Sequence, residues 1–223
     1  MNRSVVLYQP ESYRAQLYAE FVLLFMGVPL LIALLLPADG FYPALFLFTA
    51  LGLGLLHITP GFSWAELARG WGNWRSVELL LASVAVLAVC VAVIHLTRPE
   101  FAFYMVRERP DILIYLLLSY PLLSVLPQEL LFRPLFYRRY HYILPGGWRA
   151  DILNAAVFSF AHLMYWSWIV AAMTFVGGLF FARAYRARGS FALAVLLHTL
   201  AGNIIFIVGL GAFFLAVNVE RPF

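Results

Sequence analysis

The chain has 223 residues, of which 64% are hydrophobic and 12% are charged, and its formal net charge is +4. Its mean hydropathy of +0.87 is far above that of an ordinary globular domain, so the composition predicts an integral membrane protein in contact with lipid and excludes a soluble one. The basic residues, all arginine, lie in short loops and at segment ends rather than in one stripe, which argues against nucleic acid as a partner.

Apolar stretches follow one another along the whole chain, and about 20 helical residues are needed to cross the hydrocarbon core of a bilayer. The clearest stretches are residues 18–36, 41–57, 79–96, 112–129, 150–166, 168–185 and 191–215. The last is too long for one crossing, and Gly209 and Gly211 predict a turn or a tilt in its second half. A β-barrel would need alternating segments of roughly ten residues, which these runs are not. We therefore expect an all-α polytopic membrane bundle of seven or eight transmembrane helices.

The distribution of arginine predicts the orientation of these helices in a cell membrane. If residues 112–141 form one span and the chain starts inside, ten arginines are cytoplasmic and four are outside, which places the N-terminus in the cytoplasm. Two full spans in this segment would break the pattern, so we expect one span bent at Pro121 or Pro127. No removable signal peptide is recognised. Residues 1–223 are expected to form a single membrane domain, with its motif-bearing core at about 112–217.

The most informative motif is the sequence Gln128-Glu129 followed by Arg133, which lies inside an apolar run. A carboxylate and a guanidinium are costly in hydrocarbon, so ionisable residues at this depth indicate function by default. A spacing of four residues puts Glu129 and Arg133 on one face of a helix, where they can form an ion pair. The alternative is a purely structural pair that fixes helix packing.

Two histidines, His162 and His198, lie in later apolar segments. Taken alone, a histidine in an apolar helix is more often hydrogen-bonded to a neighbouring helix than reactive. Their depths point to more than that. Glu129 lies nine residues from Arg138, His162 thirteen from Arg149 and His198 ten from Arg188, so at about 1.5 Å per residue all three are roughly 13 to 20 Å deep. Groups at one level favour a shared cavity. Asn154, two helical turns before His162, is a candidate supporting residue.

Other polar or small residues in the apolar runs have simpler interpretations. Glu20 lies only slightly inside the first segment, and we expect it at the membrane interface. The Gly177–Gly178 pair predicts a close helix-to-helix contact.

The motifs resemble, in order and spacing, those of the CPBP family, the CAAX-prenyl-protease and bacteriocin-processing proteins, also called abortive-infection proteins, which include the Ras-converting endoprotease. The resemblance covers residues 126–203. It rests on Gln128-Glu129-x-x-x-Arg133, on Phe158-x-x-x-His162, on a glycine-containing segment that ends in Arg188-Gly189-Ser190, and on His198 followed by Asn203.

The resemblance implies an intramembrane endopeptidase of the glutamate type, without a cofactor. In that scheme a glutamate and the first histidine activate water, and here these are Glu129 and His162. The second histidine and an asparagine stabilise the oxyanion, and here these are His198 and Asn203. This chain departs from the family twice. Gln128 replaces the first glutamate of the motif, and an amide cannot accept a proton from water. Asn203 stands five residues after His198 instead of four, so it needs a local bulge to return beside it.

Three alternatives remain open. Glu129, His162 and His198 are also the ligand types of a catalytic zinc site, although no H-E-x-x-H spacing supports one. A transporter would place similar groups near the midplane but should show inverted repeats, which are not apparent. A catalytically inactive scaffold or immunity-type protein would tolerate Gln128. A peptidase of this family would take a peptide or protein substrate such as a C-terminal signal or a lipidated tail.

Overall fold

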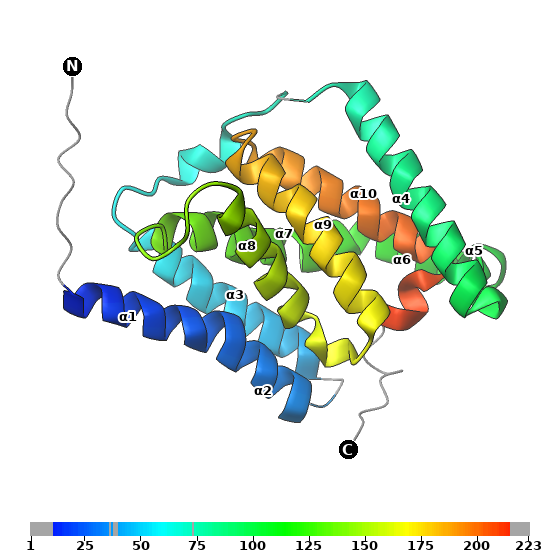
Figure 1. Ribbon diagram of the computed structural model, residues 1–223. Coiled ribbons are helices and arrows are strands. Elements are labelled where there is room, and N and C mark those ends of the chain that lie inside the picture. Colours follow the sequence, from blue (N-terminus) through cyan, green and yellow to red (C-terminus); the bar gives the residue numbers. More distant parts are fainter. Residues whose placement is uncertain (1–10, 36, 38–39, 73, 215–223) are drawn as a thin grey trace.

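The structure is a computed structural model that describes residues 11–35, 37, 40–72 and 74–214. Within these residues the chain forms helices and turns and no strand, so the predicted all-α fold is confirmed (Figure 1). The α-helices are α1 (Glu11–Val22), α2 (Val28–Leu35), α3 (Phe41–His57), α4 (Ser76–Thr97), α5 (Tyr104–Glu108), α6 (Pro110–Tyr120), α7 (Leu126–Leu130), α8 (Trp148–Ala161), α9 (Trp168–Arg186) and α10 (Phe191–Val208). Three π-helices, η1 (Leu23–Gly27), η5 (Pro121–Val125) and η6 (Leu131–Arg139), and four 3-10 helices, η3 (Trp64–Ala68), η4 (Pro99–Phe101), η7 (Leu163–Tyr165) and η8 (Leu210–Phe214), complete the described elements.

Each of the seven predicted apolar stretches is helical over most of its described length, which makes the chain a multi-pass membrane protein. Five helical segments are long and apolar enough to cross a membrane, namely Glu11–Leu35, Ser76–Thr97, Pro110–Arg139, Trp168–Arg186 and Phe191–Val208. The other two, α3 and α8, have 17 and 14 residues and reach about 26 and 21 Å, less than the roughly 30 Å of a full crossing. Several predicted positions, namely residue 36, residues 215–217, Arg3 and Arg221, lie outside the described residues.

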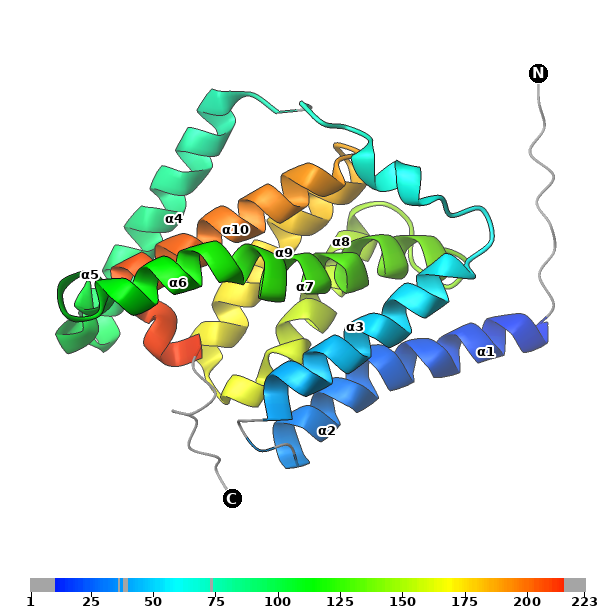
Figure 2. The same ribbon diagram turned by 180° about the vertical axis from the view of Figure 1, so that it is seen from behind.

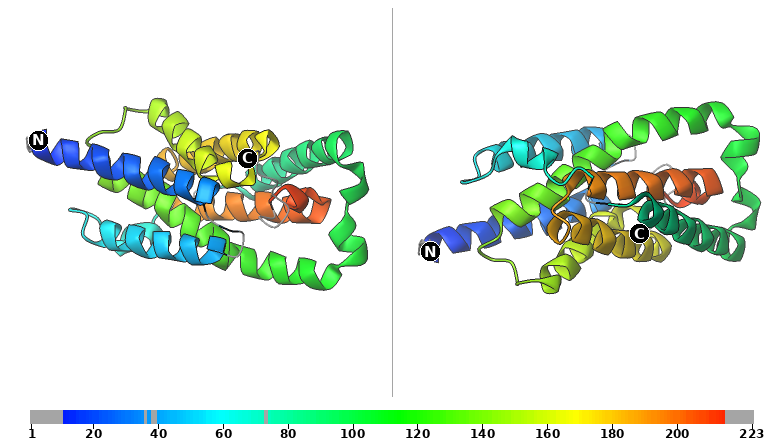
Figure 3. Two further views of the ribbon diagram at one scale, coloured as in Figure 1. Left: turned by 90° about the horizontal axis from the view of Figure 1, so that it is seen from below. Right: turned by 90° about the horizontal axis from the view of Figure 1, so that it is seen from above.

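The surface of α4 is apolar and exposed, as expected of a helix that faces lipid. Only Cys90 and Ile94 of its side chains are buried, whereas Leu80 and Leu96 are 63% and 84% exposed. In water such a surface would be an aggregation site, so it indicates contact with hydrocarbon. Figure 3 shows α10 between α4 and the run of α6 and α7, so α10 is the inner helix of this side of the bundle.

The segment Pro110–Arg139 is one uninterrupted helical run, so the prediction of one span in this part of the chain is confirmed. It passes between α3 and α10 (Figure 2). Pro121 opens the first π segment of the run and Pro134 lies inside the second. Proline lacks an N–H and its ring clashes with the preceding turn, so the helix widens locally around it. The short helix α7, which carries Gln128 and Glu129, therefore lies between two π-helical segments.

Small residues and aromatic rings pack the other helices onto this run. A Cβ on Gly52 of α3 would lie 2.1 Å from Cδ2 of Leu131, so a larger residue here would force the Leu131 side chain of η6 to move. A Cβ on Gly178 of α9 would lie 3.1 Å from the Cα of Ala155 in α8, which confirms the predicted close contact at the glycine pair. On the side of α1, edge-to-face and tilted ring contacts join Phe21 and Phe25 to Phe132, Phe136 and Tyr140.

An ion pair that the sequence did not predict ties three helices together at one end of the bundle. Glu20 of α1 accepts hydrogen bonds from the Arg139 guanidinium, with 2.7 Å between Oε2 and Nη2, and from the Tyr140 hydroxyl at 2.6 Å. Arg139 also donates to the backbone carbonyl of Leu55 and to the hydroxyl of Thr59 in and beside α3. Glu20 is therefore a packing residue and not merely an interfacial one.

Replacing Glu20 by Ala should lower the free energy of unfolding by about 3 kcal/mol, because it leaves a largely buried guanidinium unpaired. Arg75→Ala is the control, since Arg75 makes an exposed ion pair with Glu78 and its loss should change stability little. Thermal unfolding of both variants in the same detergent measures the difference, and equal stabilities would contradict a structural role for Glu20.

Candidate active site

The centre of the candidate site is an ion pair between Glu129 of α7 and Arg133 of η6, both of which are fully buried. Nε of Arg133 donates to Oε2 of Glu129 at 2.9 Å, and Nη2 donates to Oε1 at 3.2 Å. The predicted pairing across four residues is thus confirmed. A paired carboxylate keeps its negative charge in a low-dielectric interior because the guanidinium supplies both charge and hydrogen bonds.

Arg133 is held by further contacts on the side away from Glu129. Its Nη1 donates to Oδ1 of Asn154 and, at 3.3 Å, to the carbonyl of Phe132, while Nδ2 of Asn154 donates to the same carbonyl at 2.6 Å. The guanidinium carbon lies 5.2 Å from the ring centroid of Phe158 and 5.8 Å from that of Phe181. Asn154, which was a candidate supporting residue because of its spacing from His162, thus contacts Arg133 and the carbonyl of Phe132 in the structure.

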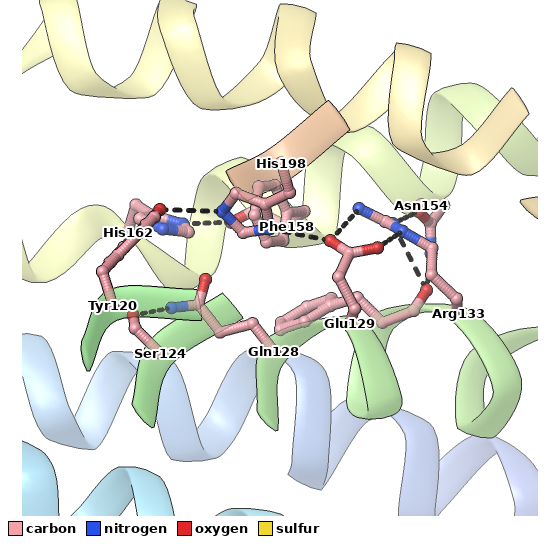
Figure 4. Close-up of polar contacts among 10 residues, drawn as sticks. Tyr120, Ser124, Gln128, Glu129, Arg133, Asn154, Phe158, His162 and His198 are labelled. Atoms are coloured by element: carbon pink, nitrogen blue, oxygen red, sulfur yellow. Dashed lines mark hydrogen bonds and ion pairs between the residues drawn. The ribbon is translucent and has the colours of Figure 1, made fainter. Parts of the chain in front are cut away.

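His198 of α10 contacts the other side of Glu129 (Figure 4). Nδ1 of His198 lies 2.9 Å from Oε1 of Glu129, and Nε2 lies 3.1 Å from the hydroxyl of Tyr120. A carboxylate only accepts hydrogen bonds, so Nδ1 carries the hydrogen and Nε2 of the neutral ring accepts from Tyr120. The ring stacks on Phe181 at a centroid distance of 4.7 Å, which fixes its plane.

His162 caps the C-terminal end of α8 and lies on the far side of His198 from Glu129 (Figure 4). Its Nδ1 donates to the carbonyl of Phe158 at 2.8 Å, so the lone pair of the neutral ring is on Nε2. No described residue forms a hydrogen bond with that nitrogen. The Phe158 ring lies 4.7 Å from the centroid of His162 and 5.5 Å from that of His198, so both histidines pack against one side chain.

Gln128 and Asn203 each bring a buried oxygen without a described hydrogen-bond partner. Nε2 of Gln128 donates to the hydroxyl of Ser124 at 2.8 Å, which leaves Oε1 as the unpaired atom. Asn203 differs from the prediction. Because α10 is regular α-helix throughout, without the bulge that was required, Asn203 lies about 140° around the helix from His198, and no described contact joins the two residues.

The geometry does not suit the alternative zinc site. Within the described part of the chain, no three His, Cys, Asp or Glu side chains form a group that could hold a metal ion. Glu129 and His198 bond directly to each other, and the remaining nitrogen of His198 is occupied by Tyr120, so these atoms would have to separate before they could bind zinc.

Sequence reasoning missed Tyr120, which is the residue that contacts Nε2 of His198. A hydroxyl inside an apolar run, two helical turns before Gln128, was the available signal, but the contact joins residues 78 positions apart. Phe181 was missed because an aromatic residue in an apolar helix looks like any other packing residue. An apolar groove lined by Ala156, Ser159 and Phe160 lies on the opposite side of α8 from Phe158, so it is separate from this site.

Comparison with known proteins identifies the part of the chain that carries the site. Residues 110–216 match the family of type II CAAX prenyl endopeptidases described as Rce1-like, and this segment includes Glu129, His162 and His198. No curated protein and no solved structure matches the chain. The match supports membership of the CPBP family for this part of the chain, residues 110–216.

Proposed function

We propose that the chain is a glutamate-type intramembrane endopeptidase that hydrolyses a peptide bond without a metal, and that Glu129, His162 and His198 are its chemical centre. The observation that supports this best is the direct contact between a wholly buried glutamate and a histidine ring, at 2.9 Å, with Arg133 holding the glutamate from behind. A carboxylate, a histidine and a second histidine grouped in this way supply the base and the charge stabilisation that amide hydrolysis requires.

Water activation falls to His162 in this proposal. Nε2 of the neutral ring holds a lone pair, and no described residue competes for it. His162 would take a proton from the attacking water and return it to the leaving amine, as a general base and then a general acid.

Glu129 acts mainly through His198. Both of its oxygens already accept N–H groups, from Arg133 and from His198, and a carboxylate beside a guanidinium is a weak base. Its charge instead fixes the Nδ1–H form and the orientation of the His198 ring, which is one role of the carboxylate in a Ser-His-Asp triad. This role revises the expectation that Glu129 itself removes the proton of water.

The expected substrate is a peptide or protein that reaches the site within the membrane, such as a C-terminal signal or a lipidated tail. We place the chain in the cell membrane with its N-terminus in the cytoplasm. Three ion pairs support a single arginine-rich end of the bundle, because they join segments whose arginines were all predicted to be cytoplasmic. These pairs are Arg138–Glu66, Arg186–Asp151 and Arg188–Glu78.

One observation favours a second candidate, a catalytically inactive membrane scaffold of the same fold. Gln128 stands where the family has its first glutamate, and its buried Oε1 has no described partner. An amide at this position keeps the packing of α7 but adds no base.

Replacing Glu129 by Gln should abolish cleavage of a membrane-tethered peptide reporter, because the amide no longer fixes the Nδ1–H form of His198. A loss of about 10⁴-fold in kcat is the scale seen when a triad carboxylate becomes an amide. The measurement is the rate of reporter cleavage by the purified wild type and variant in lipid. A variant that cleaves at the rate of the wild type would remove Glu129 from the mechanism.

The same assay with Gln128→Glu separates the two candidate functions. In a working protease a second carboxylate beside Glu129 should leave activity unchanged or lower it, because two adjacent buried negative charges repel each other. Cleavage by Gln128→Glu alone, with a silent wild type, would establish the inactive scaffold instead. Loss of wild-type activity on chelation that zinc restores would establish the metal alternative.

Replacing His162 by Gln should lower kcat by about 10²–10⁴-fold, the usual contribution of a general base, with little change in thermal unfolding. His95→Gln is the matched control, because His95 is an exposed histidine of α4 outside the site. Cleavage rates that fall equally in both variants would show that His162 has no specific role.

Replacing Arg133 by Leu should reduce both folding yield and cleavage, because it leaves Glu129 as an unpaired buried charge at a cost of about 3–5 kcal/mol. Arg183→Leu is the control, since Arg183 is an exposed arginine of α9. Yield and thermal unfolding in detergent, together with the reporter assay, give the comparison. Normal folding with full activity in Arg133→Leu would refute the arrangement.

A further inference from the structure

The hydroxyl of Tyr120 lies on the nitrogen of His198 that faces away from Glu129. Oxygen and Nε2 are 3.1 Å apart, and the two rings meet edge to face at a centroid distance of 6.1 Å. In the neutral form of the ring, with Nδ1 of His198 donating to Glu129, Nε2 holds the lone pair and accepts from the Tyr120 O–H. A continuous chain of hydrogen bonds thus runs from Arg133 through Glu129 and His198 to a phenol.

Gly202 provides the space that the Tyr120 ring occupies. A Cβ on Gly202 would lie 2.2 Å from Cε1 and 2.5 Å from the hydroxyl oxygen of Tyr120, so every other residue would displace the ring. Gly202 lies four residues after His198, on the same face of α10 and one turn farther along. The backbone of α10 and the ring of Phe206, 5.1 Å from the centroid of Tyr120, therefore hold the phenol beside His198.

We propose that Tyr120 is a catalytic residue of this site, whose hydroxyl donates a hydrogen bond to the carbonyl oxygen of the substrate as negative charge develops on it. The inference rests on the proposed peptidase function. It adds to that function the oxyanion donor, which neither Asn203 nor the neutral His198 supplies.

The other candidate donors are poorly suited to this position. Neutral His198 presents a lone pair and not an N–H at Nε2, because its hydrogen is committed to Glu129. Asn203 lies about 140° around α10 from His198. An oxyanion needs a donor that is already in place before the reaction, and a ring packed against a glycine has little freedom to lose.

The step itself changes only hydrogen bonds at Tyr120. In the resting site its O–H points to Nε2 of His198. When a tetrahedral intermediate forms beside His198, the same O–H donates to the new oxyanion, and the phenol keeps its proton throughout. The proton of the attacking water goes to His162 and later to the leaving amine. Tyr120 therefore adds a hydrogen bond to the proposed mechanism and no further proton transfer.

The first test is Tyr120→Phe in the full-length chain, with Tyr115→Phe as the matched control. Tyr115 lies on the same helix, is 64% exposed and loses the same hydroxyl. Tyr120→Phe should lower kcat about a hundredfold, the usual cost of removing one oxyanion donor, with KM and thermal unfolding unchanged. Tyr115→Phe should match the wild type. A wild-type kcat in Tyr120→Phe overturns the inference.

A second measurement separates an oxyanion donor from a residue that only positions His198. A membrane-anchored peptide aldehyde, whose hydrate resembles the tetrahedral intermediate, and the corresponding peptide alcohol are bound by wild type and Tyr120→Phe. Binding of the aldehyde alone should weaken, by about tenfold or more. Equal weakening for both ligands means a structural role and overturns the inference.

An exchange of residues tests the pairing of Tyr120 with Gly202. Gly202→Asn alone should clash with the ring and lower thermal stability. In the Tyr120→Ala background the clash disappears and an amide at position 202 faces the emptied space, so Tyr120→Ala with Gly202→Asn should recover part of the activity that Tyr120→Ala loses.

The two proposals fail in distinguishable ways. A wild type that neither cleaves the reporter nor binds the aldehyde overturns the peptidase function and this inference together. A wild type that cleaves, is inactivated by Glu129→Gln and is unaffected by Tyr120→Phe overturns only the role of Tyr120.

Discussion

The interior of this membrane protein is organised around one constraint, the charge of Arg133. A guanidinium that no solvent reaches needs a partner for its charge and acceptors for its hydrogens, and the surrounding helices provide them. Glu129 supplies the charge, Asn154 and the carbonyl of Phe132 supply further acceptors, and two aromatic rings cover its faces. Segments from α7 to α9 are thereby fixed relative to one another, and α10 joins them when His198 binds Glu129.

The irregular helix that carries the ion pair also depends on proline. Pro121 and Pro134 lie in π-helical turns on either side of α7, so the motif lies on a short regular helix between two widened ones. Widened turns leave backbone carbonyls without their usual helical donors, and the carbonyl of Phe132 is used in this way by Arg133 and Asn154. In this part of the helix, a backbone carbonyl accepts hydrogen bonds from buried side chains, so neither group is left without a partner.

Sequence reasoning found the parts of this arrangement that depend on local spacing. The Glu129–Arg133 pair follows from a separation of four residues, and the shared depth of His198 with Glu129 follows from counting residues from arginine-marked ends. The contact of Tyr120 with His198 could not be found this way, because it depends on how α6 crosses α10 and on the missing side chain of Gly202. The shortness of α8 was missed as well. Apolar composition continues past His162, where the helix gives way to a 3-10 turn, and composition alone does not record that break.

The bond between Glu20 and Arg139 has a consequence for the order of assembly, since it joins residues 119 positions apart. A chain made from its N-terminus presents the Glu20 carboxylate to the membrane long before the arginine that neutralises it has been synthesised. Until then the first helix carries an unpaired acid near one end, where water or lipid headgroups must solvate it. The bond that joins α1 to the helix of Arg139 therefore cannot form until that helix has been synthesised.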